Sequence, residues 1–210
     1  MKIAILKKGV TLVEMLVAIA VVTMLMTGVT LLFTQAWKIN AYVYRQSIAT
    51  LSASQGAQVF AREVRQARQS DAGDYAFVSG SDTEVTLFAD LDKDGLVERL
   101  HYYYDESNGH LLKGITDPTG TPPTYAAGDA TTVVVAANII NDSATEPIFR
   151  YYNDEWPENV VDNPLTTPVS PQEVRIVEIN LFVDPDEDHE PSRTEIKTLS
   201  AFRNLNEEVL

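Results

Sequence analysis

Residues 2–33 read KIAILKKGVTLVEMLVAIAVVTMLMTGVTLLF, and this stretch decides how the chain is organised. A basic head is followed by Gly9–Glu14, and the next charged residue after Glu14 is Lys38. The run from Met15 to Phe33 is apolar apart from three threonines and a glycine. It is long enough to cross a bilayer, since a membrane helix takes about 20 residues. The stretch therefore predicts a membrane-spanning helix near the N-terminus.

The order of the head and the apolar run separates this segment from an ordinary secretory signal, which is cut after its apolar core. Here the candidate processing site, Gly9, comes before the core, so a cut there leaves the helix on the mature protein. Lys2, Lys7 and Lys8 would hold the N-terminus in the cytoplasm by the positive-inside rule. We therefore expect a leader at residues 1–9 and an extracytoplasmic location for everything after residue 37.

Glu14 is the one charged residue at the start of the apolar run, and two interpretations of it stay open. A carboxylate deep in the bilayer costs about 2.5–3.5 kcal/mol. At the membrane interface it would instead favour the N-terminus of the helix through the macrodipole. Alternatively, it lies in the apolar phase and needs a positive partner inside an assembly.

The segment Gly9-Val10-Thr11-Leu12-Val13-Glu14 and the apolar helix after it resemble the processing motif of type IV pilins and type II secretion pseudopilins. The resemblance implies cleavage between Gly9 and Val10 by a prepilin peptidase and N-methylation of Val10. It also implies that Glu14 pairs with the N-terminal amine of a neighbouring subunit. Phenylalanine is commoner than valine after the glycine, but other apolar residues occur there in the family.

The later part of the chain is similar, more loosely, to W-type minor pilins and J-type minor pseudopilins. The resemblance implies a structural subunit, not an enzyme, that primes or caps a filament pulled from the membrane by an ATPase acting on other subunits. The implied partners are other pilin subunits, the prepilin peptidase, the inner-membrane assembly platform and membrane lipid. The implied location is the bacterial cytoplasmic membrane, as a single-pass protein with its C-terminal domain outside, and then the filament.

Two alternatives to a minor subunit remain at this point. Within the family the chain could be a major pilin. From another class, it could be a membrane-anchored, calcium-dependent adhesion or binding domain that does not polymerise. Processing at Gly9 separates the filament subunit from the plain anchor, because an anchor needs no such cut.

The composition excludes nucleic-acid binding through a basic surface, thiol chemistry and disulfide bonds. The 210 residues include 16 Lys+Arg and 30 Asp+Glu, a net charge of −14. Without the leader's three lysines, 13 basic residues face 30 acidic ones, a balance of −17. This excludes the basic footprint of a nucleic-acid-binding protein. The absence of cysteine excludes thiol chemistry and the disulfide that many pilins carry near the C-terminus.

The helix is expected to continue well beyond the apolar run, because small and apolar residues recur every three or four positions and so share one helical face. These residues are Ala49, Ala53, Ala57, Phe60, Val64 and Ala67. One helix of roughly 90 Å is predicted, with two helices broken near residues 36–40 as the alternative. The expected division is leader 1–9, membrane and assembly helix 10–36, amphipathic continuation 37–70 and β-rich domain 71–210.

After Asp71 the pattern changes to that of strands, so the predicted fold class is α+β: a pilin-like long helix packed on an antiparallel β-sheet. The alternation of apolar residues predicts strands at 84–89, 97–104, 110–115, 131–140, 148–152, 173–183 and 194–202. Turns are expected at 92–95 and 106–109. Four prolines make residues 153–172 a surface loop.

An aspartate-rich turn is the candidate metal site. Asp90, Asp92 and Asp94 precede Gly95 in the pattern D-x-D-x-D-G, and carboxylates so spaced can converge on calcium, with Glu98 as a further ligand. An EF-hand is excluded, because the twelfth loop position is a histidine and the flanking residues predict strands. The alternative is a plain polar hairpin turn, since Asp and Gly favour turns in any case. No cofactor is required, and calcium is the one candidate.

Two other clusters have simpler interpretations. The acidic run 184–190 could be a second cation site but is better explained as a solvated loop. The tyrosines at 102–104 and 151–152 could form a stacking surface, but at strand spacing they are better explained as core and edge packing. No histidine has metal-ligand spacing, and the sequence contains no nucleophile motif or phosphate-binding glycine loop.

Overall fold

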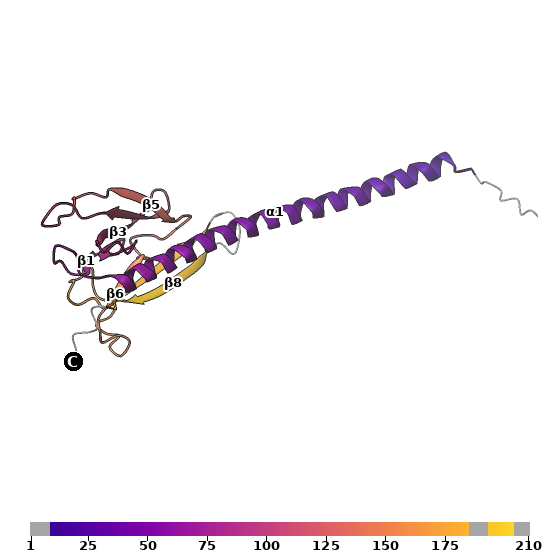
Figure 1. Cartoon of the computed structure of the whole chain (residues 1–210). Coiled ribbons are helices and arrows are strands. Elements are labelled where there is room, and N and C mark those ends of the chain that lie inside the picture. The colour runs from indigo at the N-terminus through magenta and orange to yellow at the C-terminus, as the bar shows by residue number, and fades with distance from the viewer. Residues whose placement is uncertain (1–8, 185–192, 204–210) are drawn as a thin grey trace, which may run out of the picture. The chain divides into compact units, whose positions relative to one another are not determined.

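A computed structural model describes residues 9–184 and 193–203 (Figure 1). The contacts divide the chain into two compact units, Met1–Tyr44 and Arg45–Leu210. We call the second unit the β-domain, because it contains all the described strands. Helix α1, Leu12–Gln66, begins in the first unit and ends in the β-domain.

Helix α1 is continuous over 55 residues, and residues 36–40, where a break was the alternative, are helical. It ends at Gln66, a few residues before the predicted end at 70. The reason is strand-like pairing just beyond it. Ala67 forms an isolated bridge with Ala89, and the Arg68 amide donates to the Phe88 carbonyl at 3.0 Å.

The strands form two antiparallel sheets, where the sequence predicted one. The first sheet contains, in spatial order, β1 (Phe77–Gly80), β2 (Glu84–Ala89), β3 (Glu98–Asp105), β4 (His110–Thr116) and β5 (Thr131–Ala136). The second contains β6 (Phe149–Tyr152), β7 (Ile176–Val183) and β8 (Thr194–Ala201). The fold class is α+β, as predicted.

Three strands differ from the sequence prediction by more than one residue at an end, and one of them, β7, begins at Ile176 instead of residue 173. Strand β1 was not predicted, because its four residues, FVSG, are too few to show a period. The strand expected over 131–140 ends at Ala136, because Asn138 adopts a left-handed backbone with φ of 59° and bends the chain. Beyond the bend, Ile139 bridges to Val183 of β7, so this segment connects the two sheets.

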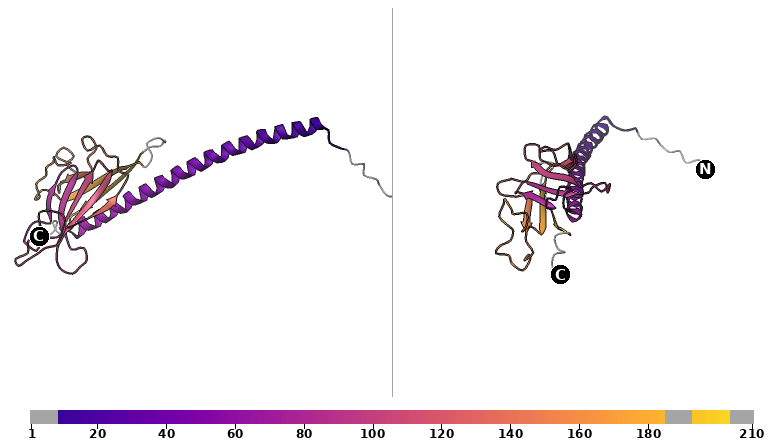
Figure 2. Two further views of the ribbon diagram at one scale, coloured as in Figure 1. Left: turned by 90° about the horizontal axis from the view of Figure 1, so that it is seen from above. Right: turned by 60° about the vertical axis from the view of Figure 1, so that its left-hand side comes forward.

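The predicted apolar face of α1 is buried, and it packs on both sheets. The ring of Phe60 lies 5.0 Å from that of Tyr102 on β3 and 5.4 Å from that of Phe149 on β6, centroid to centroid. On β8, the Ser200 hydroxyl donates to the Ala61 carbonyl at 2.7 Å. Figure 2 shows this last part of α1 beside the strands. The helix therefore joins the two sheets in one core.

Gly56 marks the closest approach of α1 to the first sheet. A Cβ atom at this position would lie 2.8 Å from the carbonyl oxygen of Val135 on β5. Such a contact is shorter than van der Waals packing allows, so a side chain here would push helix and strand apart. The absence of a side chain at Gly56 thus allows the close packing of α1 on β5.

Strand β7 is buried on both faces. Glu178 and Asn180 alternate along it with Val177, Ile179 and Leu181, and all five residues are buried. The Glu178 carboxylate accepts a hydrogen bond from the Tyr152 hydroxyl at 2.7 Å. It also pairs with Arg150 at 3.2 Å and Lys197 at 2.8 Å. Partners on the flanking strands thus compensate the buried charge.

Candidate functional site

The residues of the N-terminal motif form the start of α1. The Glu14 amide donates to the Thr11 hydroxyl oxygen at 3.3 Å. In return, Oε2 of Glu14 accepts from the Thr11 amide at 2.8 Å and from its hydroxyl at 2.9 Å. This reciprocal pairing is a capping box, which satisfies backbone donors that a helix start leaves without partners. The spacing Thr-x-x-Glu was the available signal for it, and the sequence interpretation did not use it.

Gly9 and Val10 lie just before this cap. Both are exposed and belong to no helix or strand. The peptide bond between them is therefore accessible, in extended chain next to a helix start. In the described residues, Glu14 accepts hydrogen bonds only from the uncharged donors of Thr11. Because both donors use Oε2, the other carboxylate oxygen, Oε1, is left for a partner outside the described chain.

The apolar run of α1 is exposed along its whole length, and α1 is long and apolar enough to cross a membrane. Its polar atoms are satisfied within the helix. The hydroxyls of Thr23, Thr27 and Thr30 donate at 2.8–2.9 Å to carbonyl oxygens three or four residues back. Such bonds let threonine lie in a helix without water, so these residues are compatible with a lipid environment.

Aromatic residues follow the apolar run. The rings of Phe33 and Trp37 lie 6.2 Å apart, and Trp37 is 70% exposed. Trp37 and Tyr44 also line a shallow hollow of about 270 Å³ on this unit. Trp and Tyr are enriched at membrane–water interfaces, where an apolar ring meets headgroups. Trp37 and Tyr44, with Lys38 between them, are thus residue types of such an interface, and the end of the membrane segment near residue 36 stays a prediction.

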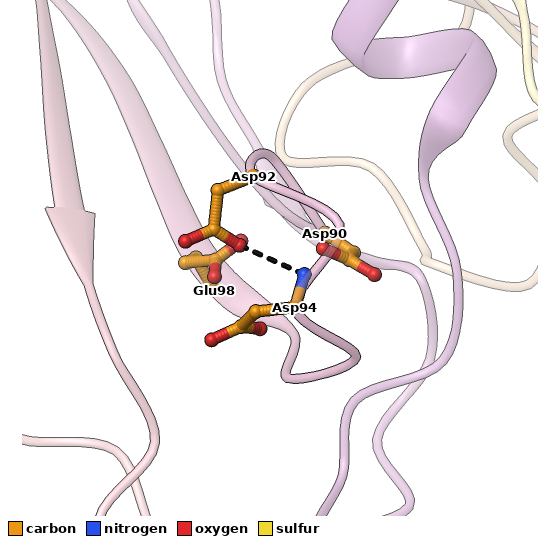
Figure 3. A group of neighbouring side chains, drawn as sticks. All are labelled: Asp90, Asp92, Asp94 and Glu98. Atoms are coloured by element: carbon orange, nitrogen blue, oxygen red, sulfur yellow. Dashed lines mark hydrogen bonds between the residues drawn. The ribbon is translucent and has the colours of Figure 1, made fainter.

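The four predicted ligands of the aspartate-rich turn come together. Asp90, Asp92, Asp94 and Glu98 each place one carboxylate oxygen within 4.8 Å of the others (Figure 3). Lys93 and Gly95 have φ of 64° and 97°, which produces the tight turn between β2 and β3. The sequence pattern therefore predicted the convergence of these side chains correctly.

The turn also uses these carboxylates to satisfy its own backbone. Asp90 accepts from the Lys93 amide at 2.7 Å, Asp92 from the Asp94 amide at 3.1 Å, and Asp94 from the Leu96 amide at 2.8 Å. These are the local bonds by which aspartate favours turns. The plain polar turn and the cation site are thus both compatible with the geometry.

Glu98 distinguishes this turn from an ordinary one, because it is buried beside two aspartates. Burial raises the pKa of Glu98, the hydrogen bond from the Leu91 amide lowers it, and the charges of Asp92 and Asp90 raise it further. Carboxylates gathered in this way are the donors that calcium prefers. A cation there would relieve the repulsion between them.

The carboxylates of the aspartate-rich turn fit a hard cation, but one of the four has both oxygens in use. Within the described chain, Asp92, Asp94 and Glu98 each use one oxygen in the turn and have the other available. The second oxygen of Asp90 instead pairs with Arg68 Nη2 at 3.2 Å. Calcium takes six to eight oxygens, so water or backbone carbonyls would complete such a site.

The tyrosine cluster is explained by packing. Tyr102 and Tyr151 are fully buried, and the Tyr151 hydroxyl donates to the Ser81 and Glu84 carbonyls at 2.8 and 3.0 Å. These tyrosines therefore belong to the core, as the simpler interpretation predicted. Of the acidic run 184–190, only Asp184 lies within the described residues.

Glu63 is a charged residue that sequence reasoning missed. It lies on the buried face of α1, where Lys113 of β4 donates to its carboxylate at 2.7 Å and the Tyr102 hydroxyl donates to its other oxygen. Burial raises the pKa of Tyr102 well above its usual value, and the adjacent Glu63 carboxylate adds to the rise. The available signal was a carboxylate three residues after Phe60, on the apolar stripe.

Together, a capped motif at an accessible bond and an exposed apolar helix fit a protein anchored in a membrane through its N-terminal helix. The family model described as the prokaryotic N-terminal methylation motif matches residues 6–30. This match supports the type IV pilin and pseudopilin family, whose members are structural proteins. A search of curated proteins finds no significant match to the chain.

Proposed function

We propose that this protein is a minor subunit of a type IV pilus or a type II secretion pseudopilus, assembled through α1 after cleavage between Gly9 and Val10. One observation carries the proposal: the methylation-motif match spans an accessible Gly9–Val10 bond directly before a capped apolar helix. A prepilin peptidase would cut that bond and methylate the new N-terminus. The minor status rests on the looser resemblance of β6–β8 and the proline-rich loop to W-type pilins and J-type pseudopilins.

The assembly contact follows from the charges around the cap. Once the chain is cut, Val10 carries a positive amine about one helical turn before Glu14. The carboxylate keeps Oε1 available while Thr11 occupies Oε2. Both charges would lie in a low dielectric, where a mismatched or unpaired charge is strongly unfavourable. Glu14 of one subunit would therefore select the Val10 amine of a neighbour and set the docking position.

The proposal includes a domain order and a location. Residues 1–9 are the leader, 10–36 the membrane and assembly helix, 37–70 its amphipathic continuation and 71–210 the extracytoplasmic domain. Other pilin subunits and the assembly platform of the inner membrane are the proposed partners. We also propose that the turn of Asp90, Asp92 and Asp94, with Glu98, binds calcium, because the four carboxylates converge and one of them is buried.

Processing provides the direct test. Intact-mass measurement of the membrane-extracted protein should give a chain that starts at Val10 and carries one added methyl group. Gly9→Ala should abolish the cut. Gly28→Ala is the matched control, because a Cβ there has no neighbour within 4 Å, and it should be processed normally. A mature chain that starts at Met1, or after Phe33, would contradict the proposal.

Assembly is tested separately with Glu14→Val. This change makes the helix more apolar, so membrane insertion and the Gly9 cut should persist. Incorporation into the filament should fall at least tenfold, measured as protein in sheared fractions. Thr30→Val, which removes a polar group elsewhere in the run, should assemble normally. If Glu14→Val also assembles normally, crosslinking decides the outcome: several partners refute the pairing role, and a single partner places the subunit at the tip.

A further inference from the structure

A cleft of about 900 Å³ opens on the β-domain next to the aspartate-rich turn. Three segments of the chain form it: residues 68–76 after α1, the end of the aspartate-rich turn at Gly95 and Val97, and residues 171–175 before β7. We propose that this cleft binds a saccharide that bears a carboxylate. The inference does not depend on the filament role, since it concerns a ligand of the β-domain itself. The polar residues that line it are Arg68, Gln69, Asp71, Tyr75, Gln172 and Arg175.

The lining of the cleft is less acidic than the chain as a whole. Two arginines and one aspartate line it, whereas the whole protein has a net charge of −14. The aspartate, Asp71, is already used, because its carboxylate accepts from the Val97 amide at 2.9 Å and joins two walls of the cleft. Because Arg68 pairs with Asp90, Arg175 is the arginine of the cleft whose charge is not used by a described carboxylate, and it is the main group that could pair with an anion.

Both guanidinium groups are held in position. Arg68 Nη2 donates to the Gly95 carbonyl at 2.9 Å and pairs with Asp90, and its Nε is buried, so this nitrogen is not exposed to a ligand. In the same described part of the chain, Arg175 uses Nη1 alone, toward the Gln172 and Val174 carbonyls at 2.8 and 3.2 Å. A guanidinium fork of this kind matches a carboxylate in a bidentate manner.

The neutral lining indicates a sugar. Tyr75 is 56% exposed, so one face of its ring is open to a ligand. The Gln172 amide lies 3.4 Å from the Tyr75 hydroxyl, and Gln69 donates to the Gly73 carbonyl. Amides both donate and accept, as the hydroxyls of a saccharide require, and an aromatic face packs on the C–H face of a sugar ring. The volume is within the usual range for a small-ligand site.

The anionic group should be a carboxylate rather than a phosphate. Asp90 and Asp71 lie beside the arginines, so a doubly charged group would meet more repulsion than a singly charged one. The Arg68–Asp90 pair also joins the cleft to the proposed calcium turn. A cation that takes Asp90 as a ligand would release Arg68 toward the cleft, and calcium should therefore tighten saccharide binding.

The test uses the full chain in detergent micelles, titrated by calorimetry with trigalacturonic acid and with its fully methyl-esterified form. The acid should bind saturably below about 1 mM, and the ester, which has the same ring and no charge, at least tenfold more weakly. Arg175→Gln should weaken binding of the acid at least tenfold. Arg62→Gln removes the same charge from an exposed position of α1 outside the cleft, and should bind like the parent protein.

A second pair of variants covers the case in which Arg175→Gln fails to fold, which its melting temperature would reveal. Tyr75→Phe keeps the ring and should retain binding, whereas Tyr75→Ala should weaken it at least threefold. Absence of saturable binding at 10 mM, equal binding of acid and ester, or equal binding of the two Tyr75 variants would overturn the proposal. Tighter binding of an acidic hexapeptide than of the saccharide would overturn the assignment of ligand class.

Discussion

The two parts of α1 are made of one helix and have opposite surfaces. From Met15 to Phe33 apolar side chains cover all sides and are exposed, whereas every buried residue of α1 lies at or beyond Ala49. In the later part, small residues form a single buried stripe and arginines cover the opposite side. A helix that is apolar all round requires lipid or a bundle, and a one-sided helix requires a protein surface. The difference shows that one helix is built for two environments.

The two carboxylates on α1 show the same contrast. Glu14 is held by neutral donors of its own first turn and keeps one oxygen for another molecule. Glu63 is enclosed by Lys113 and Tyr102 from the β-domain. The first would meet its charged partner only in the proposed filament, and the second has its partners inside the fold.

The largest expected effect comes from breaking the internal pair. Glu63→Ala leaves Lys113 buried without a counter-charge, which should lower the free energy of unfolding of the β-domain by about 3–5 kcal/mol. For a chain of this size that is a fall in melting temperature of roughly 6–20 °C. Glu14→Val should leave the same melting temperature unchanged. Thermal unfolding in micelles, followed by near-UV circular dichroism, measures both.

A double variant separates the charge from the packing. Glu63→Met with Lys113→Met replaces the pair by apolar side chains of similar length and should recover most of the stability, because a buried ion pair often contributes little over an apolar pair. If Glu63→Ala melts like the parent protein, Glu63 does not stabilise the β-domain and the comparison between the two carboxylates is wrong. The comparison is also wrong if Glu14→Val lowers the melting temperature as much as Glu63→Ala does.

A smaller effect, confined to the β-domain, is expected from calcium. If the turn binds calcium with a Kd of about 0.1–1 mM, 10 mM calcium should stabilise the folded state by roughly 1.4–2.7 kcal/mol by mass action. Asp92→Ala should remove the shift. Asp154→Ala, at an exposed position outside the turn, should keep it. If the parent protein melts at the same temperature in calcium and in chelator, the turn binds no calcium and is a plain polar turn.

The smallest effect is a rise in melting temperature on removal of the Glu98 charge, opposite in sign to the effect of Glu63→Ala. Folding raises the pKa of Glu98, so ionised Glu98 weakens the folded state, and stability from the protonated form is lost as pH rises through that raised pKa. In chelator at pH 7, Glu98→Gln should therefore raise the melting temperature by a few degrees at most, and the gain should disappear toward pH 4. In calcium the same variant should melt below the parent protein. A fall in melting temperature in chelator would show that the charge of Glu98 supports the turn.

Local patterns were sufficient to predict most elements and the start of the chain. The apolar run and the stripe at every third or fourth residue predicted α1, and the motif that the family model matches was visible at Gly9. The aspartate spacing predicted which side chains meet in the turn. In each case the residues that act together lie within a few positions of one another, where the helix or turn period fixes their geometry.

Contacts between distant segments could not be predicted in this way. Alternation assigns a side chain to a face of a strand but not the strand beside it, so one sheet was expected where two form. Glu63 and Lys113 are separated by 50 positions, and no local period connects them. The same holds for the cleft, which Arg68 and Arg175 line from opposite ends of the β-domain sequence.

The close contacts of α1 have a mechanical consequence. Gly56 lies against β5, Ala61 bonds to β8, and Glu63 holds β3 and β4, so the attachments are spread along the helix axis and reach both sheets. Tension applied along α1 loads these attachments together, in shear, instead of peeling them one after another. A pull on the helix is therefore carried into the whole β-domain at once, and the domain moves as a single load-bearing body.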